Sequence, residues 1–136
     1  MNTIKLVTSI ERTECRNLYG MKTVGLNKIK IPTDVIWEKI AVRAFPSLSV
    51  TDKIEDKVHI YTSTLKFYSC IDFADRKSYA YRIKMIDGTY KMIGGYHRPI
   101  PIMTVQESAP EKASDNQWNE VSIVLESRFQ LPTITF

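Results

Sequence analysis

The sequence predicts an α+β fold, predominantly antiparallel β in the form of a sandwich or a partly open barrel, with one packed helix at about residues 34–45. Apolar and polar residues alternate through most of the chain after Lys57, which is typical of half-buried strands. Within this region Asp87-Gly88 separates two strand-like runs, as the turn of a β-hairpin does. The helix is predicted by an apolar stripe at helical spacing, which Pro46 ends.

Length and composition indicate a single globular domain. The 136 residues are 43% hydrophobic and 25% charged, so they fit one domain with a core of its own. Within residues 1–136 we expect a long polar loop at 106–117 and a C-terminal extension at 130–136. The chain has no long apolar run, so we expect synthesis in the cytoplasm and no membrane contact. Cys15 and Cys70 are isolated and are predicted to be free thiols.

The first half of the chain predicts one strand and the helix with irregular segments around them. The helix begins at Thr33 or Asp34 as N-cap and runs to Phe45. Gly25 is predicted to mark a bulge. The remaining segments are a strand at 4–10, a helical turn or loop at 11–19, a mixed strand-like run at 22–31, and a connector at 47–56.

The second half predicts the sheet. Its strands are expected at 58–73, 79–93 as a hairpin, 102–105 as an edge strand, and 118–129. In the hairpin, alternation places Tyr81 and Ile83 toward the core and Arg82 and Lys84 on the opposite face. We therefore expect the hairpin to be the centre of the sheet, with a basic outer face.

The net charge of +4 is unevenly distributed. Residues 1–65 hold ten Lys/Arg and seven Asp/Glu, residues 66–98 hold seven and three, and residues 99–136 hold two and five. The hairpin region is therefore basic and the C-terminal region acidic. This asymmetry fits nucleic-acid contact, contact between the basic and acidic parts of neighbouring subunits, or neutralisation within one monomer.

Enzymatic chemistry has little support. The only histidines are His59 and His97, and neither forms a signature with Cys15 or Cys70. Asp72, Asp75 and Asp87 are placed as turn residues, and no ligand spacing indicates a metal. We therefore expect no enzyme, no cofactor and no metal site.

The segment Gly94-Gly95-Tyr96-His97-Arg98 is the loop with the most binding potential. Its glycines permit close backbone approach, while His97 and Arg98 supply hydrogen-bond donors for an anion or an acidic partner. The competing interpretation is a bulge that redirects the chain after the hairpin. A small enzyme or ligand-binding domain around His97 and Arg98 is the weakest functional hypothesis.

Basic residues interleave with aromatic ones around the hairpin, which favours nucleic-acid binding as an alternative function. Lys77-Ser78-Tyr79-Ala80-Tyr81 resembles the RNA-recognition-motif signature at its basic, aromatic, small and second aromatic positions. The chain departs from that signature at its glycine, β-branched and final aromatic positions. The interleaved residues are Lys66, Tyr68, Arg76, Lys77, Tyr79, Tyr81, Arg82, Lys84, Tyr90, Lys91, Tyr96 and Arg98.

The favoured hypothesis is a non-enzymatic structural or assembly subunit, in concrete terms a small phage virion protein of the tail, the head-completion region or the capsid. Its partners would be copies of itself or other protein subunits, and its destination the virion. Leu131 to Phe136 is predicted to add a strand to a neighbour's sheet. The alternative is a nucleic-acid-binding module using the basic hairpin at 79–98. The expected partner-binding residues are Arg82, Lys84, Lys91, His97, Arg98 and Phe136.

Overall fold

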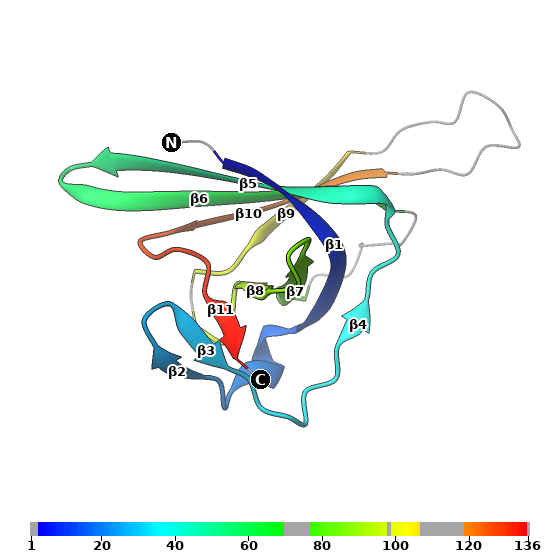
Figure 1. Ribbon diagram of the computed structural model, residues 1–136, viewed down its shortest axis with the longest axis horizontal. Helices are drawn as coiled ribbons and strands as arrows, with labels where there is room; N and C mark the ends of the chain where they lie inside the picture. Colours follow the sequence, from blue (N-terminus) through cyan, green and yellow to red (C-terminus); the bar gives the residue numbers. More distant parts are fainter. Residues whose placement is uncertain (1–2, 70–76, 98, 107–118, 136) are drawn as a thin grey trace, which may run out of the picture.

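The computed structural model describes residues 3–69, 77–97, 99–106 and 119–135. These residues form a largely antiparallel sheet and one short 3₁₀ helix, η1 (Cys15–Leu18), as Figure 1 shows. The strands are β1 (Thr3–Glu14), β2 (Lys22–Gly25), β3 (Lys28–Lys30), β4 (Glu38–Lys39), β5 (Arg43–Glu55), β6 (Val58–Ser69), β7 (Tyr79–Met85), β8 (Tyr90–Ile93), β9 (Ile102–Gln106), β10 (Asn119–Ser127) and β11 (Thr133–Thr135).

The strands follow the order β2-β3-β11-β8-β7-β1-β5-β6-β10-β9, and β4 pairs with β1. β1 belongs to both halves of this sheet. Its residues 3–6 pair with β5, and its residues 7–14 pair with β7, with a register shift between Val7 and Ser9. A shift of this kind bends a strand. Figure 1 shows β1 curving from the half that holds β5, β6, β10 and β9 to the half that holds β7 and β8.

The main core lies between the two halves. Val7 and Ile10 of β1 are completely buried, and so are Leu65 of β6 and Ile83 of β7. The core face predicted for the first strand of the central hairpin is confirmed here, because Tyr81, Ile83 and Met85 all belong to this core. The predicted β-rich, antiparallel class is confirmed as well.

A second apolar cluster covers the opposite face of β7 and β8. It contains Cys15 and Leu18 of η1, Ala80 of β7 and Met92 of β8, and Trp37 packs against it. The face that carries Arg82 is therefore covered by chain rather than open to solvent.

The predicted helix at 34–45 is wrong: this segment holds β4 and the start of β5 with irregular chain around β4, and no α-helix occurs among the described residues. Four of its residues, Val35, Ile36, Ile40 and Val42, are β-branched, which lowers helix propensity. β4 pairs with β1, and the Ile40 N–H donates to the Ile10 carbonyl at 3.0 Å. Strand pairing at the edge of β1 therefore decided the conformation.

The predicted connector at 47–56 is also wrong, because this segment belongs to β5. β5 and β6 form a long hairpin that pairs from Arg43 with Tyr68 to Glu55 with Val58. Asp56 and Lys57 at its turn have φ of +50° and +65°. Positive φ at both central residues is the geometry of a type I′ turn, here built without glycine.

The central hairpin has a turn one residue longer than predicted. The Gly88 N–H donates to the Met85 carbonyl at 3.0 Å, and the Met85 N–H donates to Thr89 at 2.8 Å. Of the turn residues only Gly88 has a positive φ, of +92°. This is a three-residue loop with a bulge rather than a two-residue type I′ turn.

The C-terminal segment pairs within its own chain. β11 runs parallel to β3 and antiparallel to β8, so both of its edges have partners in the same sheet. The strand addition to a neighbour that the sequence predicts is therefore not available to residues 133–135 in this arrangement. The predicted polar loop at 106–117 lies outside the described residues from Glu107 onward.

Gly94 and Gly88 test how packing and backbone strain combine. Both have positive φ, but a Cβ on Gly94 would lie 2.7 Å from Pro101 Cδ, whereas a Cβ on Gly88 would meet nothing within 4 Å. We expect Gly88→Ala to lower the free energy of unfolding by about 1–2 kcal/mol, from strain alone. We expect Gly94→Ala to lower it by about 2–4 kcal/mol, because overpacking adds to the strain.

Urea denaturation of the two variants measures these losses. Gly25→Ala is the control, since a Cβ there would make only ordinary contacts at 3.7 Å. Equal losses at Gly88 and Gly94 would contradict a packing role for Pro101.

Candidate functional site

Arg82 is held between aromatic rings rather than presented to solvent. Its guanidinium carbon lies 4.5 Å from the centre of the Trp37 ring and 5.6 Å from that of Tyr90. One guanidinium nitrogen donates to Glu11 at 2.8 Å, and the Arg82 side chain is 18% exposed. Its Nε is buried without a hydrogen-bond partner in the described chain. Cation–π contact and the ion pair therefore account for its position.

Lys84 and Lys91, two further residues of the predicted partner surface, lie on opposite faces of the sheet. Lys84 pairs with Tyr90 and shares its face, where its Nζ lies 5.8 Å from the ring centre. Lys91 pairs with Ile83, a fully buried core residue, and therefore points to the inside of the fold. The three basic residues of the hairpin thus do not form one surface, and partner binding by Arg82 and Lys84 stays a prediction.

His97 lies in the segment after Gly94-Gly95 and is exposed. Its ring contacts Tyr96 edge-on at 5.0 Å. Gly94 packs against Pro101, and a Cβ on Gly95 would lie 3.0 Å from the sulfur of Met21. Packing of this kind favours the bulge interpretation of the two glycines. Arg98 and Phe136 lie outside the described residues.

Of the cysteines and histidines considered for catalysis, Cys15, His59 and His97 are described, whereas Cys70 lies outside the described residues. Cys15 is buried, and burial raises the pKa of its thiol above the usual range, which disfavours the reactive thiolate. His59 instead contacts Asp52, with 2.8 Å between Nε2 and Oδ2, and stacks on Tyr61 at 4.4 Å. No cluster of three potential metal ligands occurs within the described ranges. The described part of the chain also has no helix long and apolar enough to span a membrane.

The basic and aromatic residues considered for nucleic-acid binding are distributed over several surfaces. Tyr81 is buried in the main core, and Tyr90 packs with the second cluster. Lys66 and Tyr68 are exposed on β6, where Arg43 lies 5.0 Å from the Tyr68 ring centre. The interleaving in the sequence therefore does not become one stacking platform.

A pocket of about 290 Å³ opens between the two halves of the sheet; we call it the lysine pocket. Lys5 enters it from β1, at a position paired with buried Leu48, and Lys91 enters from β8. Burial lowers the pKa of Lys91, repulsion by Lys5 lowers it further, and Asp87 opposes the shift. The rest of the wall includes Asp52, Tyr61 and Gln130.

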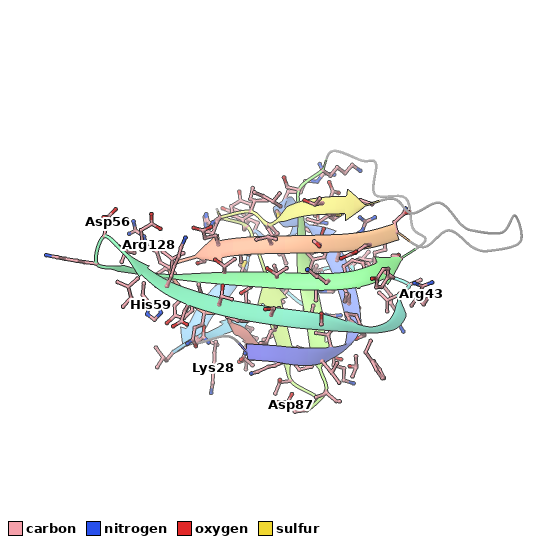
Figure 2. The ribbon with its side chains drawn as sticks, turned by 90° about the horizontal axis from the view of Figure 1, so that it is seen from above. Lys28, Arg43, Asp56, His59, Asp87 and Arg128 are labelled. Atoms are coloured by element: carbon pink, nitrogen blue, oxygen red, sulfur yellow. The ribbon has the colours of Figure 1, made fainter. Side chains whose placement is uncertain are left out.

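An apolar groove of about 730 Å³ adjoins this pocket and shares Tyr61 and Gln130 with it. Leu26 comes from the turn between β2 and β3, where Asn27 has a φ of +58°. Phe129 follows the end of β10, and its N–H donates to Ser127 Oγ at 3.1 Å. Lys28 and Arg128 line the groove and are exposed. Figure 2 shows Lys28, His59 and Arg128 toward the end of the molecule that carries Asp56.

Sequence reasoning identified Lys91 but not the rest of this site. The strand predicted at 118–129 includes Phe129, whereas β10 ends at Ser127. Leu26 had a signal, because a large apolar residue between Gly25 and Asn27 stands in a turn. No local sequence pattern marks Lys5 or Tyr61 as a site residue, because only the order of the strands brings them to the same pocket.

Comparison of the chain with protein-family models, with curated protein sequences and with solved structures finds no significant match. The assignment of function therefore depends on the geometry of the chain itself.

The stack on Arg82 predicts a measurable coupling with Trp37. We expect a double-mutant cycle of Arg82→Met and Trp37→Leu to give a favourable coupling of about 1 kcal/mol in the free energy of unfolding, because the contact is partly desolvated. Lys84→Met with Trp37→Leu is the control cycle and should be additive within a few tenths of a kcal/mol. Additive losses in the first cycle would show that the ring contact contributes nothing.

The charge environment of Lys91 predicts a pH effect. Since its folded pKa lies below the ordinary 10.5, the unfolded chain binds more protons between the two values. Stability should therefore rise with pH across that window, and Lys91→Gln should remove this rise. A titration of the Lys91 ε-methylene by NMR measures the pKa directly.

In that titration, Lys5→Gln should move the pKa of Lys91 toward its ordinary value, because it removes the repelling charge. Asp87→Asn should move it in the other direction. If Lys5→Gln has no effect on the pKa, the two ammonium groups do not interact.

Proposed function

We propose that the protein is a non-enzymatic assembly subunit that contacts another protein subunit through the apolar groove. One observation carries the proposal. Leu26 is 97% exposed and Phe129 is 77% exposed, yet both line the same groove. Adjacent exposed hydrophobic side chains in a concave site are typical of interaction surfaces. Covering the two side chains would contribute about 1.5–3 kcal/mol each.

The surroundings of the groove support protein contact over catalysis. Lys28 and Arg128 line the groove together with Leu26 and Phe129, so a bound partner would cover an apolar pair that has positive charges beside it. The β5–β6 hairpin, which projects farther than its neighbours in Figure 1, lies at the same end and carries exposed Ile54. A small phage virion protein is the concrete form of the proposal, and it rests on composition and on the absence of a catalytic signature in the sequence.

A random peptide library displayed on phage and selected on the immobilised protein tests the groove. We expect selected peptides to bind the wild type and to lose about tenfold or more in affinity for Leu26→Asp and for Phe129→Asp, because each change places a charge in the apolar pair that the peptide covers. Fluorescence anisotropy with synthetic peptides measures the affinities. Ile36→Asp is the matched control, since Ile36 is 86% exposed but does not line the groove.

Two results would contradict the proposal. One is a selection in which no enriched peptide distinguishes the groove variants from Ile36→Asp. The other is tight binding of a single-stranded oligonucleotide that weakens steeply with salt and with a Lys66→Gln/Lys84→Gln double substitution, which would favour the nucleic-acid-binding module.

A further inference from the structure

The lysine pocket and the apolar groove are two parts of one site. Tyr61 and Gln130 line both the pocket and the groove, so one ligand can occupy both at the same time. The pocket, at about 290 Å³, is larger than a carboxylate group, and the groove, at about 730 Å³, is larger than an apolar side chain, so both groups can be accommodated. Alternate side chains of an extended peptide point to the same side.

Two lysines and the carboxylate of Asp52 line the pocket, and a second carboxylate, Asp87, interacts electrostatically with both lysines. Within the described residues neither Lys5 nor Lys91 forms an ion pair. The carboxylate of Asp52 contacts His59 at 2.8 Å, and Asp87 accepts hydrogen bonds from the Thr89 hydroxyl at 2.6 Å and the Thr89 N–H at 3.0 Å. Both nearby carboxylates therefore have contacts outside the lysine pair.

The position of Lys91 is costly without an anion. It stands on the core-facing side of β8, between Ile93 on its own strand and Ile83 on β7, where alternation calls for an apolar residue. Lys5 and Lys91 line one cavity. Burial lowers the pKa of Lys91 most, repulsion by Lys5 lowers it further, and Asp87 opposes the shift. A carboxylate bound beside the two lysines would offset the repulsion between them and favour the charged form of Lys91.

We propose that the lysine pocket binds a carboxylate side chain, Asp or Glu, of an extended segment from another protein subunit, while an apolar side chain two residues away, on the same face of that segment, occupies the groove between Leu26 and Phe129. The proposal rests on the assembly function above and specifies its partner. Tyr61 and Gln130 offer hydroxyl and amide donors beside the two lysines, which suits the two oxygens of a carboxylate. Lys28 and Arg128 extend the positive charge along the groove and favour an acidic segment.

The peptides selected on the protein provide the test. We expect an acidic residue two positions from a large apolar residue in their consensus, because these positions share a face of an extended segment. Replacement of that acid by its amide should weaken binding to the wild type by about ten- to a hundredfold, as loss of a charge-assisted contact does. The same replacement should have almost no effect on binding to the Lys5→Gln/Lys91→Gln double variant.

Lys28→Gln is the matched control, because it removes one positive charge from the groove and leaves the pocket intact. With Lys28→Gln the difference between acid and amide peptides should be retained. Far-ultraviolet circular dichroism and the ¹H–¹⁵N spectrum establish that each variant is folded.

The outcomes separate this inference from the assembly function. The carboxylate assignment is wrong if the consensus lacks an acid, or if the amide peptide loses the same affinity for the wild type as for the double lysine variant. The docking function still holds in that case if binding depends on Leu26 and Phe129. If peptide binding is unchanged in Leu26→Asp and Phe129→Asp, both the carboxylate assignment and the docking function are wrong. Self-association of the purified chain that Phe129→Asp abolishes would identify a second copy as the occupant and overturn the acidic segment.

Discussion

The pairing of β1 with two different strands is the constraint on which the rest of the structure depends. A register shift between Val7 and Ser9 bends β1, so the sheet turns back and its halves face one another. Leu48 and Leu65 of one half then meet Ile83 and Ile93 of the other in a single core. The Thr8 hydroxyl donates to the Lys84 carbonyl at 3.1 Å and gives the bulge a local hydrogen bond. Without the bend each half would expose an apolar face to water.

The same bend leaves one end of the core uncovered. Alternation along β5 and β6 continues past the facing half, so beyond Leu48 and Leu65 the inner face carries Asp52, Tyr61 and His59 together with exposed Ile54. Lys5 and Lys91 lie at the border between the core and this extension. A charged pocket beside a hydrophobic core is thus a consequence of two halves of unequal length, visible in the projecting hairpin of Figure 1.

Period-two alternation predicted the faces of the strands well. Val121, Ile123 and Leu125 are buried as expected, because each strand has one face on the core. The helix at 34–45 failed for a physical reason. Its apolar spacing fits a helix, but its β-branched residues tolerate an extended chain, and the free edge of β1 supplied the hydrogen bonds. Such competition between local preference and a distant strand edge is invisible in the sequence alone.

The candidate site was less predictable than the fold, because its parts come from β1, β6, β8 and the turn between β2 and β3. Only strand order brings Lys5 near Lys91, and a sequence does not contain strand order. Each half of the site nevertheless left a local irregularity: Lys91 interrupts the apolar face of β8, and Leu26 stands in a turn that polar residues usually fill. Both choices work against the stability or solubility of an isolated chain. Their occurrence in two parts of one continuous site is therefore better explained by a partner that compensates both than by two independent defects of folding.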